Sequence, residues 1–428
     1  MKVKNLIIGA GVTGLSMAYH LQKSGKKDFA VLERAAGPGG LCSSVNYKNF
    51  TFDYSGHVIH ARNAYTRALL KKLLGKNLLS AERKAFVYLQ NTFVPYPFQT
   101  NLAYLKPEIA AECADAFLAA QRHKKNNFKN FADWALSSYG AGIYKYFMRP
   151  YNEKLWRAKA DNLTCAWCAD FIPRTSAGAI IKGARSKTAA VYGYNANFIY
   201  PKTGGIGALA RALAEKIENI FYNAEVKKID AVKKTAYTDK GVFEYENLIN
   251  TSPLKTFVPS CAGLKKNIYA LAEKLKNNKV FVLNLGVNRA IKNISWVYFP
   301  EAKFKFYRAG AQSAFSPAVA PKGCGALYIE ISAAGGSEKP DFKTLEKEII
   351  SALKEAGILK KEDKILAALW LELSPAYVTY DAARETAVPQ IISALKENNI
   401  YAAGRYGAWE YSFMEKNILD GKRLAEKL

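Results

Sequence analysis

Three glycines near the N-terminus are spaced to bind the pyrophosphate of a dinucleotide. The segment Gly9–Gly14 (GAGVTG) follows a short apolar run and opens an amphipathic stretch. In such a turn Gly9 permits a tight bend, Gly11 lets the backbone approach a phosphate, and Gly14 lets a helix and a strand pack closely. The start of the following helix presents N–H donors to the negative charge. Glu33 ends the next apolar run, where a carboxylate can accept hydrogen bonds from ribose hydroxyls.

Two later glycine-rich segments favour FAD over NAD, although both cofactors share this fingerprint. Gly37–Ser43 (GPGGLCS) can wrap a longer dinucleotide, and Gly404–Gly407 (GRYG) follows the apolar run Ile400–Ala403 and precedes a helical pattern. Many flavoproteins close the FAD site with such a late strand–glycine–helix element, and ordinary turns are the alternative interpretation. The sequence therefore predicts FAD. The expected contacts from these segments are Gly9, Gly11, Val12, Thr13, Gly14, Glu33, Arg34, Gly40, Leu41 and Gly404.

Hydrophobic periodicity predicts the elements that position these residues. A β-α-β unit is expected first, with a strand at 3–8, a helix at 12–24 that stops near Gly25, and a strand at 29–32. Later helices are expected at 109–124, 128–138, 141–146 and 344–356, and later strands at 85–90, 92–95, 219–230, 248–251, 280–287, 294–299, 326–331 and 365–373. The strands on either side of Asn91 are expected to form a hairpin.

The predicted fold class is α/β, with a Rossmann-like FAD-binding domain that carries an inserted helical bundle and an inserted, mainly antiparallel β-sheet domain. We expect the substrate to bind over the flavin, where the three parts meet. The expected domains are a discontinuous FAD-binding domain (1–80, 188–252 and 390–428), a helical domain (103–187), and a substrate domain formed by the sheet (81–102 and 253–389).

The formal net charge of +26 arises from 62 Lys and Arg residues against 36 Asp and Glu residues. These basic residues are spread along the chain, often as pairs such as Lys124–Lys125 and Lys360–Lys361. No compact basic block interleaved with aromatic residues occurs, so we expect a solvated surface and no nucleic-acid partner.

Six scattered cysteines do not form a disulfide framework, which favours a reducing compartment. No apolar run is long enough for a membrane span, so we expect a soluble, cytoplasmic protein. Cys165 and Cys168 form a CxxC pair, but the chain offers no second pair and no neighbouring histidines. We therefore expect no metal site.

Several longer motifs resemble the UDP-galactopyranose mutase family, and its eukaryotic branch in particular. The similarity extends, with gaps, from the first predicted strand to the last helix, whereas amine-oxidase-like and protoporphyrinogen-oxidase-like flavoproteins share only the FAD elements. The motifs are Phe93–Asn101 (FVPYPFQTN), Phe147–Trp156 (FMRPYNEKLW), Cys165–Trp167, Asn195–Gly207 (NANFIYPKTGGIG), Trp296–Arg308 (WVYFPEAKFKFYR) and Gly404–Met414 (GRYGAWEYSFM).

The resemblance implies roles for individual residues. It places Arg405 in contact with FAD, and it places His57, which follows Gly56, beside the flavin ring. The uridine pocket that it implies comprises Tyr96, Gln99, Phe147, Tyr151, Asn152 and Trp156. Aromatic faces can stack on uracil and amides can match its donors and acceptors, although a packed aromatic core is the alternative. The implied catalytic and diphosphate-binding residues are Arg308, His57, Tyr298, Tyr377, Tyr411 and Arg174.

Two positions depart from the family pattern. Phe171 stands where the family has an arginine that reaches the active site, and Arg174, three residues later, is a candidate replacement. A family asparagine that helps to bind the diphosphate is absent, because Tyr411 is followed directly by Ser412. Both departures concern the phosphates and the sugar, so they affect the identity of the substrate more than the fold.

By resemblance, the chain is a flavin-dependent isomerase that interconverts UDP-galactopyranose and UDP-galactofuranose, or a related nucleotide sugar, for cell-wall or surface polysaccharide synthesis. In this family N5 of the reduced flavin attacks the anomeric carbon, and NAD(P)H is the implied reductant. The alternatives are an FAD-dependent oxidase or dehydrogenase of the amine-oxidase or protoporphyrinogen-oxidase type and, third, a basic non-enzymatic scaffold. A homo-oligomer is left open.

Overall fold

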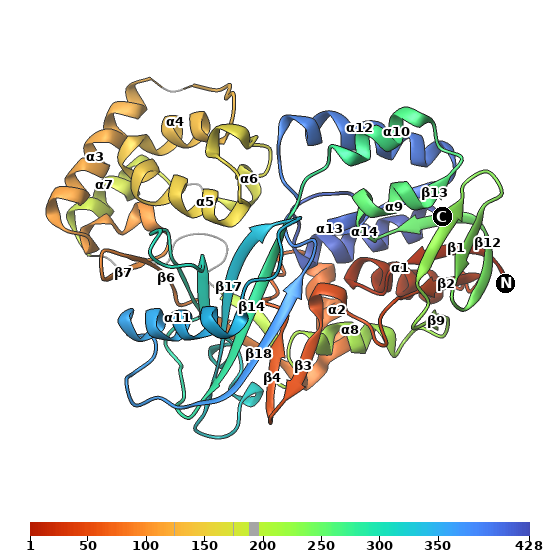
Figure 1. Ribbon diagram of the computed structural model, residues 1–428, viewed down its shortest axis with the longest axis horizontal. Helices are drawn as coiled ribbons and strands as arrows, with labels where there is room; N and C mark the ends of the chain where they lie inside the picture. Colours follow the sequence, from red (N-terminus) through yellow and green to blue (C-terminus); the bar gives the residue numbers. More distant parts are fainter. Residues whose placement is uncertain (124, 174, 188–196) are drawn as a thin grey trace.

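The computed structural model describes residues 1–123, 125–173, 175–187 and 197–428. The fold is mixed α/β and has three packed parts: a nucleotide-binding layer, a large and mostly antiparallel sheet, and a helical part (Figure 1). The chain passes between these parts several times, so the nucleotide-binding layer and the large sheet each contain segments that are far apart in the sequence. The predicted fold class, a Rossmann-like domain with a helical and a sheet insertion, is confirmed.

The nucleotide-binding layer is built around the buried strand β1 (Lys2–Ile8). This strand pairs in parallel with β2 (Phe29–Leu32) on one side and with β12 (Gly241–Asn250) on the other. Its run of consecutive apolar residues suits a parallel strand that is covered on both faces. Helix α1 (Val12–Lys23) packs against α14 (Met414–Lys427). The remaining strands of this layer are β9 (Ile220–Phe221), β10 (Val226–Asp230), β11 (Thr235–Thr238), β13 (Cys261–Ala262) and β19 (Ile400–Ala402).

The segment from α9 to α10 lies on the nucleotide-binding layer, although we predicted that it belongs to the sheet domain. Strand β13 pairs in parallel with β10, and α9 (Leu254–Ser260) contacts both strands. Helix α10 (Lys266–Glu273) packs on α12 (Ala382–Glu397), which in turn packs on β19. The predicted domain boundaries at 253 and 390 therefore need correction. The sequence did not indicate this, because β13 has only two residues and is too short to be recognised from its pattern.

The second sheet has the strand order β18-β14-β17-β16-β15-β6-β7 within the described residues. Its long strands β14 (Asn278–Val287), β17 (Gly325–Ala334) and β18 (Ile365–Leu373) are antiparallel and lie where strands were predicted. The predicted hairpin at Asn91 is confirmed, and both of its turn residues have positive φ angles, as a two-residue turn requires. Helix α11 (Phe342–Glu355) covers one face of the sheet (Figure 1). The other strands are β6 (Ala85–Leu89), β7 (Thr92–Pro95), β15 (Trp296–Tyr298) and β16 (Arg308–Ala311).

The helical part comprises α3 (Pro107–Arg122), α4 (Phe131–Ile143), α5 (Arg149–Trp156), α6 (Cys168–Phe171) and α7 (Ala177–Arg185). The helix predicted to begin at 141 is confirmed, because the non-helical backbone of Gly140 (φ 78°, ψ 166°) divides α4 into two helical segments. The second segment continues through a π-helical turn, Tyr144–Met148, directly into α5. This continuity fixes the direction in which α5 enters the space above the large sheet.

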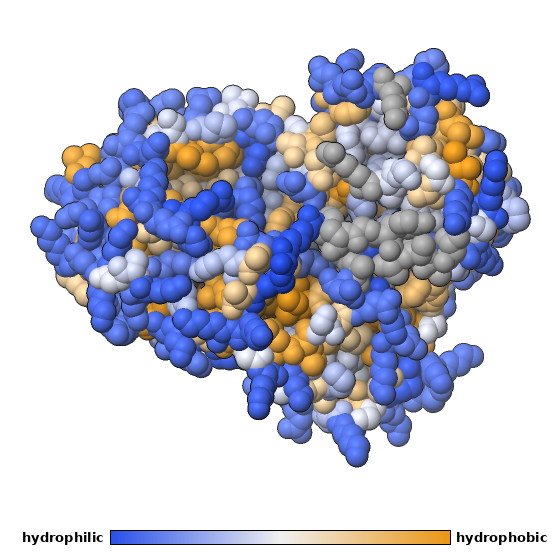
Figure 2. Space-filling model, turned by 180° about the vertical axis from the view of Figure 1, so that it is seen from behind, coloured by the Kyte–Doolittle hydropathy of each residue, from blue (hydrophilic) through white to orange (hydrophobic). Residues whose placement is uncertain are grey.

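Short elements connect the three parts. They are the strand pairs β3 (Ser44–Tyr47) with β4 (Phe50–Asp53) and β5 (Leu78–Glu82) with β8 (Asn197–Pro201), and the helices α2 (Ala64–Leu74), α8 (Gly207–Ala214) and α13 (Gly404–Gly407). The rear face of the molecule is mostly hydrophilic, with small apolar patches (Figure 2). Among the helices of the described residues, none is both long enough and apolar enough to cross a membrane.

Candidate active site

A cavity of about 790 Å³ lies at the carboxyl ends of β1 and β2, where a Rossmann-like layer binds its cofactor. Its walls come from the glycine turn after β1, the Gly37–Ser43 segment and the start of α13. The predicted cofactor residues that line it are Gly9, Gly11, Val12, Thr13, Glu33, Arg34, Gly40, Leu41 and Arg405. Gly14, Gly56, His57 and Gly404 are not among the lining residues, and the contacts of all the predicted cofactor residues with FAD stay a prediction.

The glycines of the turn are needed for different steric reasons. A Cβ atom at Gly14 would lie 2.0 Å from the carbonyl oxygen of Gly9, so only glycine lets α1 pack against the turn. A Cβ atom at Gly404 would lie 2.2 Å from Oγ1 of Thr13, which keeps α13 close to α1. At Gly11, by contrast, no protein atom lies within 4 Å of the Cβ position. Open space above Gly11 is what a closely approaching phosphate requires.

The carboxylate of Glu33 braces the glycine turn. Its two oxygens accept hydrogen bonds from the backbone N–H groups of Ala10 and Ala35, each at 2.8 Å. Each carboxylate oxygen has a second lone pair, and Glu33 also lines the cavity. The predicted contact with ribose hydroxyls is compatible with this bracing role and stays a prediction.

Two buried polar atoms have no hydrogen-bond partner among the described residues: one belongs to Arg405, which lines the cavity, and one to His57, whose pKa is lowered by burial and, less strongly, by the Arg405 charge. They are Nδ1 of His57 and Nε of Arg405. Buried polar atoms without a partner are rare in folded proteins, so these two atoms favour a polar ligand at this position. Burial lowers the pKa of His57 to about 4, so its imidazole is neutral near pH 7. The open space at Gly11 and these two atoms together fit a flavin dinucleotide.

The guanidinium of Arg405 links the cofactor cavity to a pair of tyrosines. Its Nη1 and Nη2 atoms donate to the carbonyl oxygens of Ser412 and Ala376, at 3.2 and 2.8 Å. Its Cζ atom lies 5.1 Å from the ring centroids of both Tyr377 and Tyr411, which is within cation–π range. Arg405, which lines the cavity, therefore places both tyrosine rings behind one of the cavity walls.

Arg308 is held by a buried carboxylate that the sequence analysis did not identify. Arg308 and Glu330 face each other across β16 and β17, and Nε and Nη2 of the arginine donate to the two carboxylate oxygens at 2.6 and 2.7 Å. Ser55 donates to the same carboxylate. Burial alone would raise the pKa of Glu330, but the Arg308 charge and these hydrogen bonds hold it below its usual value. The pair is therefore ionised, and Nη1 of Arg308 donates no hydrogen bond to the part of the chain that the structure describes.

Four aromatic residues from separate elements meet beside Arg308. The ring centroid of Tyr298 lies 5.0 Å from that of Tyr151 and 5.2 Å from that of Tyr96. Phe147 lies 5.5 Å from Tyr151. Because Tyr298 is the register partner of Arg308, the aromatic cluster and the guanidinium share one site. This brings together the residues that were predicted to bind a base and a diphosphate.

The two amides of the predicted base pocket are buried beside this cluster. Nε2 of Gln99 donates to the carbonyl oxygen of Pro173 at 3.3 Å, and Nδ2 of Asn152 donates to that of Met148 at 2.7 Å. Among the described residues, the amide oxygens of Gln99 and Asn152 accept no hydrogen bond. These oxygens are therefore available to donors on a ligand.

A family model for flavin-containing amine oxidoreductases matches residues 12–428 of the chain. The chain belongs to this family. Its members use a bound flavin, in agreement with the cavity described above.

Among solved structures, the chain is similar to a reduced UDP-galactopyranose mutase, with 27% identity and a TM-score of 0.93 over 100% of this chain and 93% of that chain. A protoporphyrinogen oxidase-like protein from Exiguobacterium is 16% identical, with a TM-score of 0.77 over 99% and 98% of the two chains. Putrescine oxidase bound to putrescine is 13% identical, with a TM-score of 0.66 over 100% and 99%. At these lower identities the last two show the shared fold alone.

One curated relative, a Baeyer-Villiger monooxygenase from Pseudomonas aeruginosa, is 35% identical over 98 residues. This match covers 18% of the present chain and 19% of the monooxygenase, so the chain matches only a small part of that relative's length. The chain is therefore a member of the flavin-containing amine oxidoreductase family whose likeness to the mutase extends over its full length.

Trp156 lies apart from the Tyr96–Tyr298 cluster. Its ring centroid is 5.5 Å from that of Tyr377 and 5.7 Å from that of Tyr411, and only 2% of the residue is exposed. A base could stack on Trp156 only if its neighbours moved. Trp156 thus packs on the tyrosine pair, its Nε1 has no hydrogen-bond partner among the described residues, and its predicted place in the base pocket stays a prediction.

Phe171 packs against the ring of Tyr411. The two rings are stacked, with centroids 3.7 Å apart and planes inclined by 19°. Tyr411 therefore has one face covered by an apolar ring where the mutase motif implies an arginine. Arg174, the candidate replacement, lies outside the described residues, so its predicted role stays a prediction.

A second buried carboxylate that the sequence analysis missed lies behind the cofactor cavity. Asp53 accepts hydrogen bonds from Ser44 Oγ and Tyr200 OH, each at 2.6 Å, and from the N–H of Ile206 at 3.1 Å. Gln312 accepts from the N–H of Asp53 at 3.1 Å and donates to Tyr200 at 2.9 Å. Burial raises the pKa of Asp53 to about 7 in spite of these hydrogen bonds. The network joins β4, β8 and the start of α8 to the large sheet, and α8 in turn packs on α1 of the nucleotide-binding layer.

Proposed function

We propose that this chain is a flavin-dependent isomerase that interconverts UDP-galactopyranose and UDP-galactofuranose, or a closely related pair of nucleotide sugars. The observation that carries the proposal is the assembly of Arg308 with the Tyr96–Tyr298 aromatic cluster, near His57, which is also affected by the charge of the cavity residue Arg405. Such a site offers aromatic faces to a base, a guanidinium to a diphosphate, and a flavin to the sugar. The full-length likeness to a UDP-galactopyranose mutase supports the same interpretation.

The proposed reaction requires the anomeric carbon to lose its bond to UDP and later to regain it. When bound and reduced, the flavin supplies the nucleophile for that carbon. The protein holds the departing diphosphate. Because negative charge develops on the leaving oxygen, the Arg308 guanidinium binds it more strongly in the transition state than in the ground state.

Three further residues have defined roles in this proposal. Burial raises the pKa of Tyr411, so its phenol stays protonated and can donate to a phosphate oxygen. Tyr377, whose ring centroid lies 5.3 Å from that of Tyr411, offers a second phenol. Neutral His57 provides one donor and one acceptor beside the flavin site. None of these groups needs to act as a covalent nucleophile.

NAD(P)H is the proposed reductant, and it activates the flavin without being consumed in each turnover. A water-soluble nucleotide sugar and a pyridine nucleotide agree with the cytoplasmic location that the sequence predicts. The furanose product is suited to the synthesis of surface polysaccharide.

The test is an isomerisation assay on the purified yellow protein. UDP-galactopyranose is added after reduction with dithionite and, in parallel, to the oxidised protein, and the furanose is detected by chromatography. We expect product only after reduction. Flavin reduction by an amine or a porphyrinogen, without isomerisation under either condition, would replace the proposal with an oxidase.

A further inference from the structure

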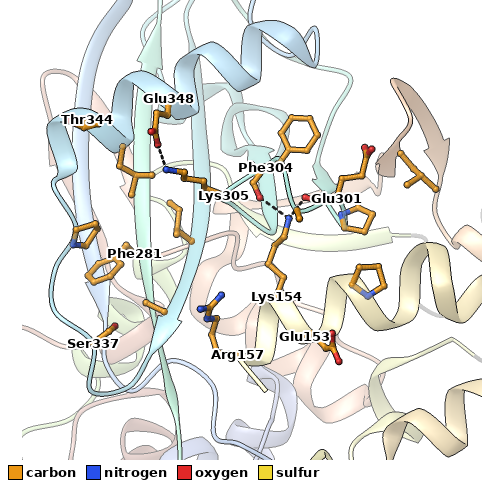
Figure 3. Close-up of a pocket in the computed structure, with 18 of the residues that line it drawn as sticks. Glu153, Lys154, Arg157, Phe281, Glu301, Phe304, Lys305, Ser337, Thr344 and Glu348 are labelled. Atoms are coloured by element: carbon orange, nitrogen blue, oxygen red, sulfur yellow. Dashed lines mark hydrogen bonds and ion pairs between the residues drawn. The ribbon is translucent and has the colours of Figure 1, made fainter. Parts of the chain in front are cut away.

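Helix α5 carries a lysine whose ammonium group is enclosed by backbone oxygens. Nζ of Lys154 donates to the carbonyl oxygens of Phe299, Glu301 and Phe304 at 2.7, 2.6 and 2.8 Å. A longer contact of 3.4 Å reaches the carbonyl oxygen of Phe306. Three N–H donors are all that an ammonium group has, so these contacts satisfy it completely. Figure 3 shows Lys154 reaching from α5 to this loop.

The surrounding charges do not provide a carboxylate partner for Lys154. In the part of the chain that the structure describes, no salt bridge to Lys154 is formed. Lys305 on the same loop pairs with Glu348 at 2.7 Å, and Glu301 uses its backbone oxygen to bind Lys154. Burial lowers the pKa of Lys154 to about 8, and four carbonyl oxygens favour its charged form, so it is protonated at neutral pH. The interaction is therefore a charge-assisted clamp on backbone.

The clamped loop joins two residues of the candidate active site. Residues 299–307 connect β15, which ends at Tyr298, to β16, which begins at Arg308. On α5, Tyr151 precedes Lys154 by three positions, so the two side chains leave neighbouring parts of one helix face. Tyr151 touches the Tyr298 ring while Lys154 holds the loop beyond it.

We propose that Lys154 is a positioning residue that docks α5 onto the β15–β16 hairpin and thereby sets the separation between the base-side ring of Tyr151 and the guanidinium of Arg308. A ligand that spans a base and a diphosphate must contact both groups at once. If the clamp is lost, α5 and the hairpin can move relative to each other, and either contact can form without the other. The part of this inference that is measured by UDP binding rests on the proposed function.

The experiment compares Lys154→Met with the wild-type holoenzyme. Methionine keeps most of the length of the side chain but cannot donate to the carbonyl groups. We expect UDP to bind roughly tenfold more weakly and kcat/KM to fall on the order of 100-fold, since a displacement of about 1 Å in a positioned group has effects of this size. FAD content and the flavin absorption spectrum should stay unchanged. Backbone amides of residues 299–307 should exchange hydrogen faster.

Lys305→Met is the matched control. It removes a lysine from the same loop and from the same cavity, of about 1160 Å³, but only an exposed ion pair is lost. UDP affinity and the exchange of 299–307 should match the wild type. Chemical rescue adds a second control, in which Lys154→Cys is treated with 2-bromoethylamine to restore an ammonium group. Wild-type protein treated in parallel corrects for the half-buried Cys165 and Cys324.

The outcomes separate this inference from the proposed function. If the wild type binds UDP and Lys154→Met binds it equally well, the inference is wrong and the proposed function stands. If the wild type does not bind UDP, the proposed function fails, and unchanged exchange in 299–307 of Lys154→Met would then also overturn the inference. Should Lys154→Met not fold, Lys154→Arg supplies the same readouts, because a planar guanidinium cannot match the three carbonyl directions.

Discussion

The Arg308–Glu330 pair shows how a single residue can serve both stability and binding. The two strands place these side chains opposite each other, and the carboxylate uses two of the donors of the guanidinium. Removing Arg308 altogether would leave Glu330 buried without a counter-charge, which typically costs about 3–5 kcal/mol. A truncation would therefore mix loss of binding with loss of stability. A substitution that keeps the charge separates the two effects.

We expect Arg308→Lys to keep FAD content and to lower kcat/KM for the nucleotide sugar by roughly 100-fold, about 2.7 kcal/mol, because lysine cannot bind Glu330 and a phosphate through one planar fork. Steady-state kinetics and the ratio of flavin to protein absorbance measure both quantities. Arg289→Lys is the control, since Nε and Nη2 of Arg289 donate to the two carboxylate oxygens of Asp363 in a similar fork. Equal losses in the two variants would contradict the role given to Arg308.

A substitution at Gly11 tests, again at the scale of a single residue, where the pyrophosphate of FAD binds. Its φ is −76°, which any residue can adopt, and a Cβ atom there would meet no protein atom. Gly11→Ala should therefore leave the melting temperature of the apoprotein unchanged within about 2 °C. The added methyl group projects into the space that a phosphate needs, so FAD affinity should fall by about tenfold or more. A variant that retains full FAD after dialysis would contradict the assigned position of the pyrophosphate.

At the scale of elements, most of the strands, helices and turns that position the site could be predicted from the sequence, because the patterns that specify them are local. The GAGVTG turn, β18 and the hairpin at Asn91 each have a period or a turn residue that specifies them. Glu330 could not be found in this way. It is one carboxylate in the otherwise apolar strand GALYIEISAA, and its partner is distant in sequence. A lone charge inside a buried strand is the signal that could have indicated it.

The burial of Trp156 and the docking of α5 were not predictable for a different reason. Both depend on how the helical part sits on the sheet, which no short-range pattern encodes. The π-helical turn between α4 and α5 rotates the helix by an amount that the sequence does not reveal. The six residues of the predicted base pocket came from the family resemblance, and no sequence pattern indicated that Trp156 contacts Tyr377 and Tyr411.

Gly140 determines how α4 crosses α3 and hence where α5 begins. Its φ of 78° and ψ of 166° lie in a region that is essentially restricted to glycine, and a Cβ atom would lie 2.3 Å from the carbonyl oxygen of Ala116. We expect Gly140→Ala to lower the free energy of unfolding by about 3 kcal/mol, as measured by chemical denaturation. Gly178→Ala, where the helix has open space, should be neutral or slightly stabilising. Similar stability of the two variants would show that the crossing tolerates a side chain.

At the scale of the whole molecule, buried polar groups as well as apolar packing join β4, β8 and the start of α8 to the large sheet, and α8 in turn packs on α1 of the nucleotide-binding layer. Asp53 belongs to β4, Tyr200 to β8, and Gln312 directly follows β16, so one network contacts three elements from distant parts of the chain. Such a network stabilises one relative placement of the two parts, because its members are buried and satisfied only in that placement. It thereby fixes the cofactor cavity relative to Arg308.

This network makes stability depend on pH in a direction opposite to that of most carboxylates. The pKa of Asp53 is about 7 in the folded state and near 3.9 when unfolded, so the folded protein binds an extra proton between these values. The stability that this proton provides is fully present below about pH 4 and is lost as pH rises through about 7. Asp53→Asn does not titrate. We therefore expect the free energy of unfolding of the wild type, relative to this variant, to decrease between pH 5 and 8 in urea denaturation. A difference that is constant or increases with pH would show that Asp53 is ionised throughout this range.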